Sequence, residues 1–285
     1  MAMIIIKKIS DLQKFLITYA GAGHDAGFVP TMGALHNGHI SLISESKENN
    51  PVTVCCIFVN PTQFNDPADY EKYPITLEND ILLLERSGCD ILFLPPVKEI
   101  YPDGTLQIKK YDLGHLEKIL EGQYRPGHFQ GVCMVIERLL NIVQPGNLYL
   151  GQKDYQQCMV VKRLVELMGA TNKINVRICP TLREKDGLAM SSRNLRLNEE
   201  ERKKAGTIYT VLRFIKERIA KGDLTGLKDA GKKMLLENGF KPDYIEIAAA
   251  SDLELINEWD GEKKVVALIA AFLNEIRLID NLALN

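Results

Sequence analysis

The most informative stretch of the chain reads Phe28-Val29-Pro30-Thr31-Met32-Gly33-Ala34-Leu35-His36-Asn37-Gly38-His39. Its apolar start predicts a strand that ends at Val29, Gly33 allows a sharp turn, and a helix is expected to begin near Gly38. A buried strand that passes through a tight turn into a helix is a basic unit of α/β folds. The stretch therefore predicts an α/β protein.

The same alternation of short apolar runs and helical patterns continues through the first 180 residues. Strands are expected at 3–6, 26–29, 52–59, 90–94, 147–150 and 174–178. Helices are expected at 10–20, 40–49, 77–87, 129–143 and 155–168, with Ser10 as an N-cap and Gly88 and Gly169 as C′ residues. Continuous apolar strands between helices predict a Rossmann-like, doubly wound parallel sheet, which binds ligands at the carboxyl ends of its strands.

The composition changes near Pro180, where a polar segment (181–194) begins. It is followed by a charged helix expected at 198–221, a helix at 227–238, and strands at 244–249, 265–272 and 275–279. The last two strands flank Asn274 and form either a hairpin or one bent strand. We therefore expect a large domain at 1–179 and a smaller C-terminal α+β domain at 180–285.

Composition and charge exclude several classes of protein. The chain has 285 residues, of which 46% are hydrophobic and 25% charged, with a net charge of −2, so it is neither disordered nor collagen-like. This charge balance predicts no nucleic-acid partner and no anionic membrane partner, while a local basic pocket for a small anion is allowed. The longest apolar run, 265–273, is too short for a membrane span, and residues 1–8 do not fit a signal peptide, so we expect a cytoplasmic protein.

The cysteines form no C-x-x-C pair, and most lie inside apolar runs. This pattern predicts reduced core cysteines and disfavours a zinc site. They are Cys55, Cys56, Cys89, Cys133, Cys158 and Cys179.

The pattern His-x-Gly-His places two imidazoles, His36 and His39, at the predicted start of a helix. The backbone N–H groups and the positive dipole end there favour an anion, and Gly38 lets a phosphate or an adenine ring approach closely. Donors at this position suit attack on a nucleotide α-phosphate. The alternatives are two histidines satisfied within a turn, or an i, i+3 metal pair, which lacks a third ligand nearby.

Two further motifs follow predicted strands. Asn60 and Gln63 carry amides that can recognise a hydroxyl and a carboxylate, although an Asn-Pro turn that only closes the strand explains them equally well. In the stretch from Gly151 to Gln157, Asp154 can cap a helix, Lys153 can hold phosphates, and Gln157 can face the same cleft. A capped helix with a solvated lysine is the alternative.

The polar segment after Pro180 contains Met190-Ser191-Ser192-Arg193-Asn194. Serine hydroxyls and one arginine in a mobile loop suit a clamp over triphosphate oxygens, and Arg183 is a candidate for the same loop. A serine-rich loop before a helix is the alternative.

Arg125 and His128, before the helix at 129–143, either line a pocket or terminate a loop.

Four motifs resemble, in this order, those of the pantothenate synthetase (pantoate–β-alanine ligase) family, and the resemblance extends over essentially all of 1–285. They are the segments 28–39, 57–64, 151–157 and 190–194. The His-x-Gly-His and Ser-Ser-Arg elements alone would indicate only the wider superfamily of nucleotidyltransferases and class I aminoacyl-tRNA synthetases. Gln152 departs from the family, which more often has Glu there.

The resemblance implies an ATP-dependent ligase of pantothenate biosynthesis, on the coenzyme A pathway. Pantoate would attack the α-phosphorus of ATP to give pantoyl adenylate and diphosphate, and β-alanine would then displace AMP. No covalent nucleophile is needed, so positioning and charge stabilisation carry the reaction. The alternatives are a nucleotidyltransferase that stops at an adenylylated product, and a nucleotide-sensing protein without turnover.

The resemblance also assigns residues. It implies His39 as proton donor, His36 as its phosphate-binding neighbour, Gln63 and Gln157 as pantoate ligands, and Gln63 as a neighbour of β-alanine. It implies that Mg²⁺ arrives with ATP, near Asp80 but without a predicted protein ligand, and that the protein is a homodimer. The implied catalytic residues are His36, His39, Lys153, Ser191, Ser192 and Arg193. The implied ATP contacts are Met32, Gly33, Ala34, Leu35, His36, Asn37, Gly38, His39, Gly151, Gln152, Lys153, Asp154, Leu182, Met190, Ser191, Ser192 and Arg193.

Overall fold

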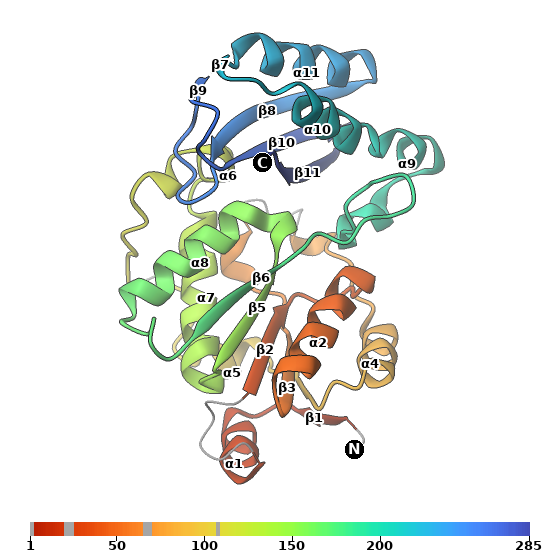
Figure 1. Ribbon diagram of the computed structural model, residues 1–285. Helices are drawn as coiled ribbons and strands as arrows, with labels where there is room; N and C mark the ends of the chain where they lie inside the picture. Colours follow the sequence, from red (N-terminus) through yellow and green to blue (C-terminus); the bar gives the residue numbers. More distant parts are fainter. Residues whose placement is uncertain (1–2, 20–25, 65–69, 107–108) are drawn as a thin grey trace. The chain divides into compact units, whose positions relative to one another are not determined.

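The computed structural model describes residues 3–19, 26–64, 70–106 and 109–285 (Figure 1). The chain divides into two compact units. Unit 1 consists of Met1–Gly151 and Val160–Pro180, and unit 2 consists of Gln152–Met159 and Thr181–Asn285. Helix α8 therefore contributes to both units.

Unit 1 contains a parallel six-stranded sheet in the order β1-β4-β3-β2-β5-β6 among its described residues. All six residues of β3 are buried, as expected for a strand covered on both faces. The strands are β1 (Ile4–Ile6), β2 (Ala26–Thr31), β3 (Val52–Ile57), β4 (Ile91–Phe93), β5 (Asn147–Gly151) and β6 (Asn175–Cys179).

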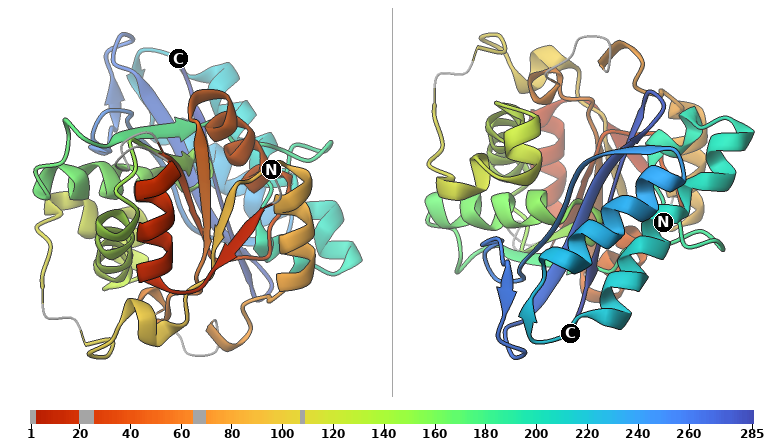
Figure 2. Two further views of the ribbon diagram at one scale, coloured as in Figure 1. Left: turned by 90° about the horizontal axis from the view of Figure 1, so that it is seen from below. Right: turned by 90° about the horizontal axis from the view of Figure 1, so that it is seen from above.

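Helices lie on both faces of this sheet (Figure 2). Helices α2 and α4 pack together on one face, and α1 and α7 pack together on the other. This arrangement confirms the predicted doubly wound sheet. Among the described residues, the helices of unit 1 with full bounds are α1 (Ile9–Tyr19), α2 (Asn37–Asn49), α4 (Leu77–Arg86), α5 (Val97–Ile100), α6 (Leu120–Tyr124), α7 (His128–Val143) and part of α8 (Tyr155–Leu167).

The direction of winding reverses next to β2. Strand β2 pairs with β3 on one side and with β5 on the other, although β5 follows it by more than a hundred residues in the chain. In open parallel sheets, ligands bind in the crevice outside the carboxyl ends of the strands at such a switch point. The topology therefore selects the carboxyl ends of β2 and β5 as the place in unit 1 to look for a site.

Unit 2 is built on an antiparallel sheet in the order β11-β10-β8. Eight of the nine residues of β10 are buried, and the apolar face of α10 packs against this sheet. The elements are α9 (Glu199–Ala205), α10 (Thr207–Arg218), α11 (Thr225–Glu237), β8 (Phe240–Ala249), β10 (Val265–Leu273) and β11 (Ile276–Ala283), with the short pair β7 (Gly222–Asp223) and β9 (Glu258–Trp259).

Strands β10 and β11 form a hairpin rather than one bent strand. They pair in register from Leu273–Ile276 outward, and Asn274 takes a positive φ of 52° in the turn. Strand β8 starts four residues earlier than predicted, at Phe240. Pro242 is tolerated because β8 lies at the edge of the sheet, where a missing N–H costs no ladder hydrogen bond, and the register shifts beside it.

Two sequence-based expectations are wrong. The helix expected at 198–221 is two helices that meet at Gly206, where a Cβ would lie 3.0 Å from the carbonyl oxygen of Asp186. Ser10 is not an N-cap, because α1 already begins at Ile9. Gly88 and Gly169 do follow helices with positive φ, as predicted. None of the helices within the described residues combines the length and the apolar character that a membrane span requires.

Candidate active site

The two histidines lie where the chain passes from β2 into α2. His36 is the N-cap of α2, with extended backbone angles (φ −140°, ψ 173°). Its Nδ1 accepts a hydrogen bond from the backbone N–H of Gly38 (3.2 Å), and Nδ1 of His39 accepts one from the backbone N–H of His36 (3.3 Å). This reciprocal capping box brings the ring centroids within 4.0 Å of each other.

The capping box also fixes the tautomer of each ring. An imidazole nitrogen that accepts a hydrogen bond carries no proton, so each neutral ring carries its proton on Nε2. Both side chains are half-buried rather than enclosed in the core. Nδ1 of each ring therefore serves the turn, as the alternative expected, and a contact of Nε2–H with a phosphate stays a prediction.

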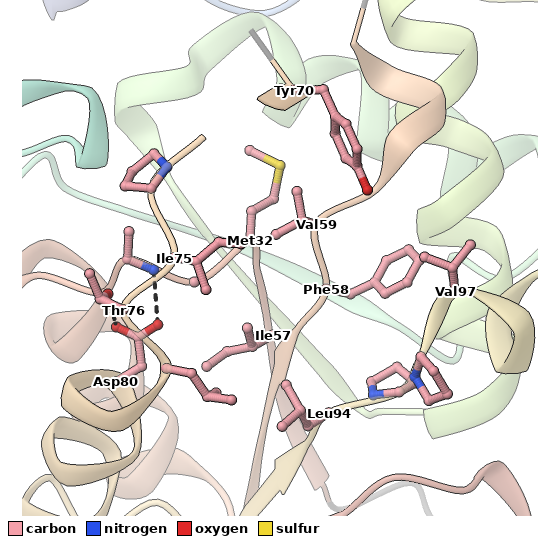
Figure 3. A pocket seen from close by; sticks show the side chains of 16 residues that line it. Met32, Ile57, Phe58, Val59, Tyr70, Ile75, Thr76, Asp80, Leu94 and Val97 are labelled. Atoms are coloured by element: carbon pink, nitrogen blue, oxygen red, sulfur yellow. Dashed lines mark hydrogen bonds between the residues drawn. The ribbon is translucent and has the colours of Figure 1, made fainter. Parts of the chain in front are cut away.

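The turn before His36 is held by a carboxylate from another helix. Gly33 and Ala34 both have positive φ, 81° and 49°. Asp80, in the first turn of α4 and only 1% exposed, lies close to Thr76 in Figure 3. It accepts the backbone N–H groups of Ala34 (2.9 Å) and Leu35 (2.8 Å) and the hydroxyl of Thr76 (2.9 Å). Both carboxylate oxygens are therefore used to hold the turn.

A pocket of about 260 Å³ opens beside this turn, at the carboxyl ends of β2, β3 and β4 (Figure 3). Its wall is mostly apolar, and Asp80 contributes the charged group. The lining residues are Met32, Gly33, Ala34, Ile57, Phe58, Val59, Tyr70, Pro74, Ile75, Thr76, Leu77, Asp80, Leu94, Pro95, Pro96 and Val97. The pocket confirms that unit 1 is hollowed at the edge where such sheets bind ligands.

Asn60 closes the turn after β3 and orients Gln63. Its Oδ1 accepts hydrogen bonds from Thr62 and from the hydroxyl of Tyr101 (2.8 Å), and its Nδ2 donates to Oε1 of Gln63 (3.3 Å). The Gln63 amide nitrogen in turn lies 2.6 Å from the sulfur of Met32. Asn60 is 1% exposed, so it acts as a support for Gln63.

Arg125, the C-cap of α6, and His128, the first residue of α7, support the same turn. The Arg125 guanidinium can only donate, so Nε2 of His128 accepts from it (3.1 Å), and Nδ1–H of His128 donates to the carbonyl oxygen of Gln63 (2.7 Å). Gly131 allows the close approach, because a Cβ there would lie 2.1 Å from the carbonyl oxygen of Thr62. The sequence left these two residues open, and the structure makes them supports of Gln63.

In unit 2, the segment after β5 forms a short 3-10 helix, η3 (Gln152–Asp154), which leads into α8. The Lys153 side chain is only 16% exposed, and its Nζ lies 3.5 Å from Oδ1 of Asp154. Gln157 is half-buried in the first turn of α8. The sequence predicted this entry into a helix, whereas the role of Asp154 as a cap stays a prediction.

The serine motif of unit 2 forms a 3-10 helix, η4 (Ser192–Arg196), which is N-capped by Ser191. Leu182 and Met190 are brought together before it, because the N–H of Met190 donates to the carbonyl oxygen of Leu182 (3.0 Å). Arg183 instead forms an ion pair with Asp280 in β11, with its side chain 16% exposed. It therefore anchors the segment to the sheet.

The cysteines offer no nucleophile at neutral pH. All six are buried and free of disulfides. Burial raises the pKa of Cys89 and Cys133 to about 12 and that of Cys179 to about 11. Since the thiolate is the reactive form, covalent catalysis by cysteine is disfavoured. In the described part of the chain, no group of three His, Cys, Asp or Glu side chains is placed to hold a metal ion.

A doubly wound parallel sheet with a histidine-capped helix at its switch point has the features of a nucleotide-binding α/β protein. The family model for pantoate-beta-alanine ligase matches residues 4–283. The chain therefore belongs to the pantoate–β-alanine ligase family.

Individual relatives agree with this assignment. The chain is 47% identical to a pantothenate synthetase of Cytophaga hutchinsonii, with 99% of each chain covered. The crystal structure of pantothenate synthetase from Thermus thermophilus superposes with a TM-score of 0.89 at 40% identity, covering 99% of both chains. A pantoate-beta-alanine ligase from Francisella tularensis, complexed with beta-gamma ATP and beta-alanine, gives a TM-score of 0.82 at 41% identity, covering 99% of this chain and 98% of that one.

Proposed function

We propose that the protein is an ATP-dependent ligase that joins pantoate to β-alanine and forms pantothenate, AMP and diphosphate. Family membership over nearly the whole chain supports this function. A relative with ATP and β-alanine bound supports the nature of two of the substrates. The observation on this chain that carries the proposal is the capping box that holds His36 and His39 as Nε2–H donors at the start of α2.

The chemistry requires activation of a carboxylate. In the first step a pantoate carboxylate oxygen attacks the α-phosphorus of ATP, and the bond to diphosphate breaks, giving pantoyl adenylate. In the second step the β-alanine amine attacks the acyl carbon, the bond to AMP breaks, and the amine loses a proton. Negative charge grows on phosphate oxygens in the first step, and fixed N–H donors stabilise it without reorganisation.

We assign the polar residues to the substrates on the family's pattern. Gln63 and Gln157 hold pantoate, and Gln63 also borders β-alanine. The amide of Gln63 suits a hydroxy acid because it both donates and accepts. Asn60 holds this amide, and His128 holds the backbone carbonyl oxygen of Gln63. The proposed ATP contacts are residues 32–39, residues 151–154, Leu182 and residues 190–193.

Mg²⁺ is proposed to accompany ATP. Mg²⁺ at such sites is bound mainly through substrate phosphates and keeps several waters, and it neutralises phosphate charge when bound. Asp80 already uses both oxygens to accept three hydrogen bonds at the turn, so the proposal gives it that role and assigns it no contact with Mg²⁺. The proposal therefore includes no protein side chain that ligates Mg²⁺. A homodimer, which rests on the family resemblance, and a cytoplasmic location, which rests on the sequence pattern, complete the proposal.

Product analysis tests this function. The protein is mixed with ATP, Mg²⁺, pantoate and β-alanine, and we expect AMP, diphosphate and the amide in equal amounts. A stable adenylylated product that persists in the presence of β-alanine would instead indicate a nucleotidyltransferase. ATP binding without release of diphosphate would indicate a nucleotide-sensing protein, and either result refutes the ligase.

A further inference from the structure

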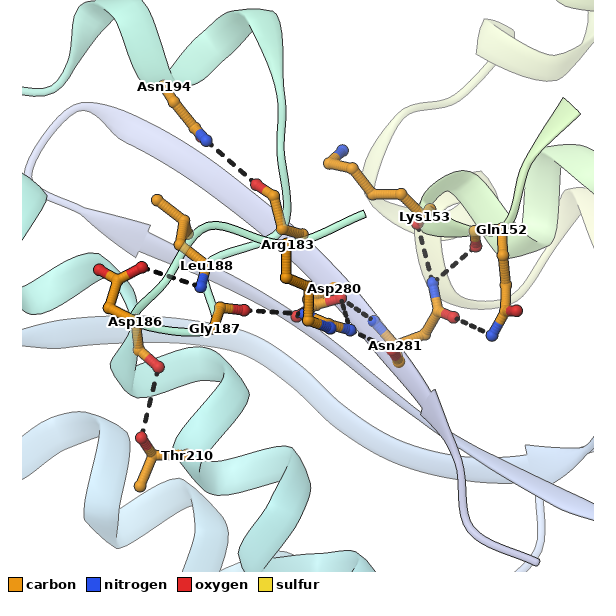
Figure 4. Close-up of polar contacts among 12 residues, drawn as sticks. Gln152, Lys153, Arg183, Asp186, Gly187, Leu188, Asn194, Thr210, Asp280 and Asn281 are labelled. Atoms are coloured by element: carbon orange, nitrogen blue, oxygen red, sulfur yellow. Dashed lines mark hydrogen bonds and ion pairs between the residues drawn. The ribbon is translucent and has the colours of Figure 1, made fainter. Parts of the chain in front are cut away.

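A side chain from the C-terminal hairpin of unit 2 holds the turn that carries Lys153 (Figure 4). Asn281, in β11, is only 2% exposed. Its Nδ2 donates to two successive backbone carbonyl oxygens, those of Gln152 (2.9 Å) and Lys153 (2.8 Å). Its Oδ1 accepts from Nε2 of Gln152 (3.4 Å). One buried amide therefore fixes both backbone and side chain of this turn.

Asn281 is itself held on both sides of its backbone. Oδ1 of Asp280 accepts the N–H of Asn281 (2.8 Å), and Nη2 of Arg183 donates to the carbonyl oxygen of Asn281 (3.1 Å). Arg183 also pairs with both oxygens of Asp280 and lies over the ring of Tyr209 (4.1 Å). The amide that meets the Lys153 turn is thus oriented by a buried ion pair.

The charge of Lys153 acts on the same network. Burial raises the pKa of Asp280, while the hydrogen bond and charge of Arg183, then the N–H of Asn281 and last the charge of Lys153, act in the opposite direction. The lysine is mostly enclosed, with 16% of its side chain exposed. The Lys153 side chain extends from the backbone whose carbonyl oxygens Asn281 holds, so a shift of these carbonyls would shift the point from which the side chain starts.

We infer that Asn281 is a positioning residue, which sets the Lys153 ammonium for ATP through the two carbonyl oxygens of the η3 turn. The inference rests on the proposed function, because it assumes that Lys153 binds ATP. A purely structural role would predict that loss of Asn281 lowers stability and leaves the kinetics of the folded protein unchanged. A positioning role instead predicts that kcat/KM for ATP falls more than in a control variant with the same loss of melting temperature.

Asn281→Asp is the sharpest variant, because it keeps the shape of the side chain. It replaces the donating nitrogen by an oxygen, which leaves two carbonyl oxygens without a donor and opposes them with negative charge. Asn281→Ser keeps one donor, and Asn281→Ala keeps none. Asp243→Asn is the matched control, because it breaks the ion pair with Arg277 (2.7 Å) in the same sheet without touching the η3 turn.

The experiment measures the melting temperature of each full-length variant and the initial rate of AMP formation, with ATP and pantoate varied in turn. We expect Asn281→Asp to lower kcat/KM for ATP at least tenfold and to change the pantoate KM less than twofold. Asp243→Asn should stay within twofold of the wild type at a comparable loss of melting temperature. Asn281→Ser should lie between Asn281→Ala and the wild type.

Kinetics of Asn281→Asp within twofold of the wild type would overturn the inference. If Asn281→Asp does not fold, equal kinetics of the Ala and Ser variants and the wild type would overturn it as well. Lys153→Ala separates the two claims. Formation of the amide by the wild-type protein supports the proposed function, whatever the Asn281 variants do. Unchanged kinetics for ATP in Lys153→Ala would overturn the positioning role of Asn281 and leave the proposed function standing.

Discussion

Replacing Asp80 tests whether the turn before His36 depends on a carboxylate from a distant part of the chain. Asp80 follows Ala34, whose N–H it accepts, by 46 positions. In the structure the Asp80 oxygens accept two backbone N–H groups and one hydroxyl at 2.8–2.9 Å, in a site with 1% exposure. Asp80→Asn keeps one acceptor oxygen and turns the other position into a donor. Whichever way the amide is oriented, one buried N–H, of Ala34 or Leu35, faces another donor.

The expected cost follows from the bond that is lost. A hydrogen bond to a charged group contributes about 1.5–3 kcal/mol, so we expect the turn to open more easily by about 2–3 kcal/mol. At 1.4 kcal/mol per factor of ten, this corresponds to amide exchange that is roughly 30- to 150-fold faster. Hydrogen–deuterium exchange of a peptide that contains Ala34 and Leu35 measures it directly. We expect kcat/KM to fall at least tenfold, because His36 and His39 follow this turn.

Asp90→Asn is the matched control, since Asp90 also accepts a backbone N–H, that of Thr53 (2.8 Å), and pairs with Lys47, but lies before β4 rather than beside the histidines. It should lower stability with little change in turnover. Exchange at Ala34 and Leu35 that Asp80→Asn accelerates less than threefold would refute the reasoning. Loss of activity with unchanged exchange would indicate that Asp80 contacts a substrate or its metal ion instead.

Three other perturbations test separate parts of the account. His39→Ala should lower kcat roughly 10²- to 10³-fold, the usual effect of one lost transition-state donor, in a protein that still folds; near-normal steady-state rates would exclude its role. Gln157→Ala should raise the KM for pantoate more than the KM for ATP in initial-rate measurements, and the reverse pattern would reject the assignment. Burial raises the pKa of Cys179 to about 11 from an ordinary value of 9.0, so the unfolded chain loses this proton first and the free energy of unfolding should fall as pH rises from 9 to 11. Cys179→Ala should make this fall smaller by up to about 2 kcal/mol in urea titrations, and parallel pH profiles would contradict it.

Local patterns predicted the elements that lie closest to the chemistry. Continuous apolar runs at 52–59 and 147–150 indicated strands buried on both faces, and the turn residues at Gly33 indicated the passage into α2. These signals are local, because a run of apolar residues and a glycine at a turn can each be recognised within a few consecutive residues. The sequence also placed His36 and His39 at a helix start, which the structure confirms.

The supports of the site could not be predicted in the same way. Asp80 reaches Ala34 across 46 positions, and Asn281 reaches the Gln152 carbonyl across 129. No periodic pattern or fixed spacing in a single sequence marks either contact, because each forms only when folding brings distant segments together. Ser10 shows that a local pattern can also mislead. Serine is a favourable N-cap residue, but Ser10 lies inside α1, which already begins at Ile9.

The most direct test of the central claim, that the paired imidazoles serve formation of an acyl adenylate from ATP, is isotope exchange in the absence of amine. Labelled diphosphate is added to the protein with ATP, Mg²⁺ and pantoate, and the label in ATP is followed over time. We predict that label enters ATP only when pantoate is present, and that His39→Ala slows this exchange at least a hundredfold. Protein that binds ATP but gives no pantoate-dependent exchange would contradict the account.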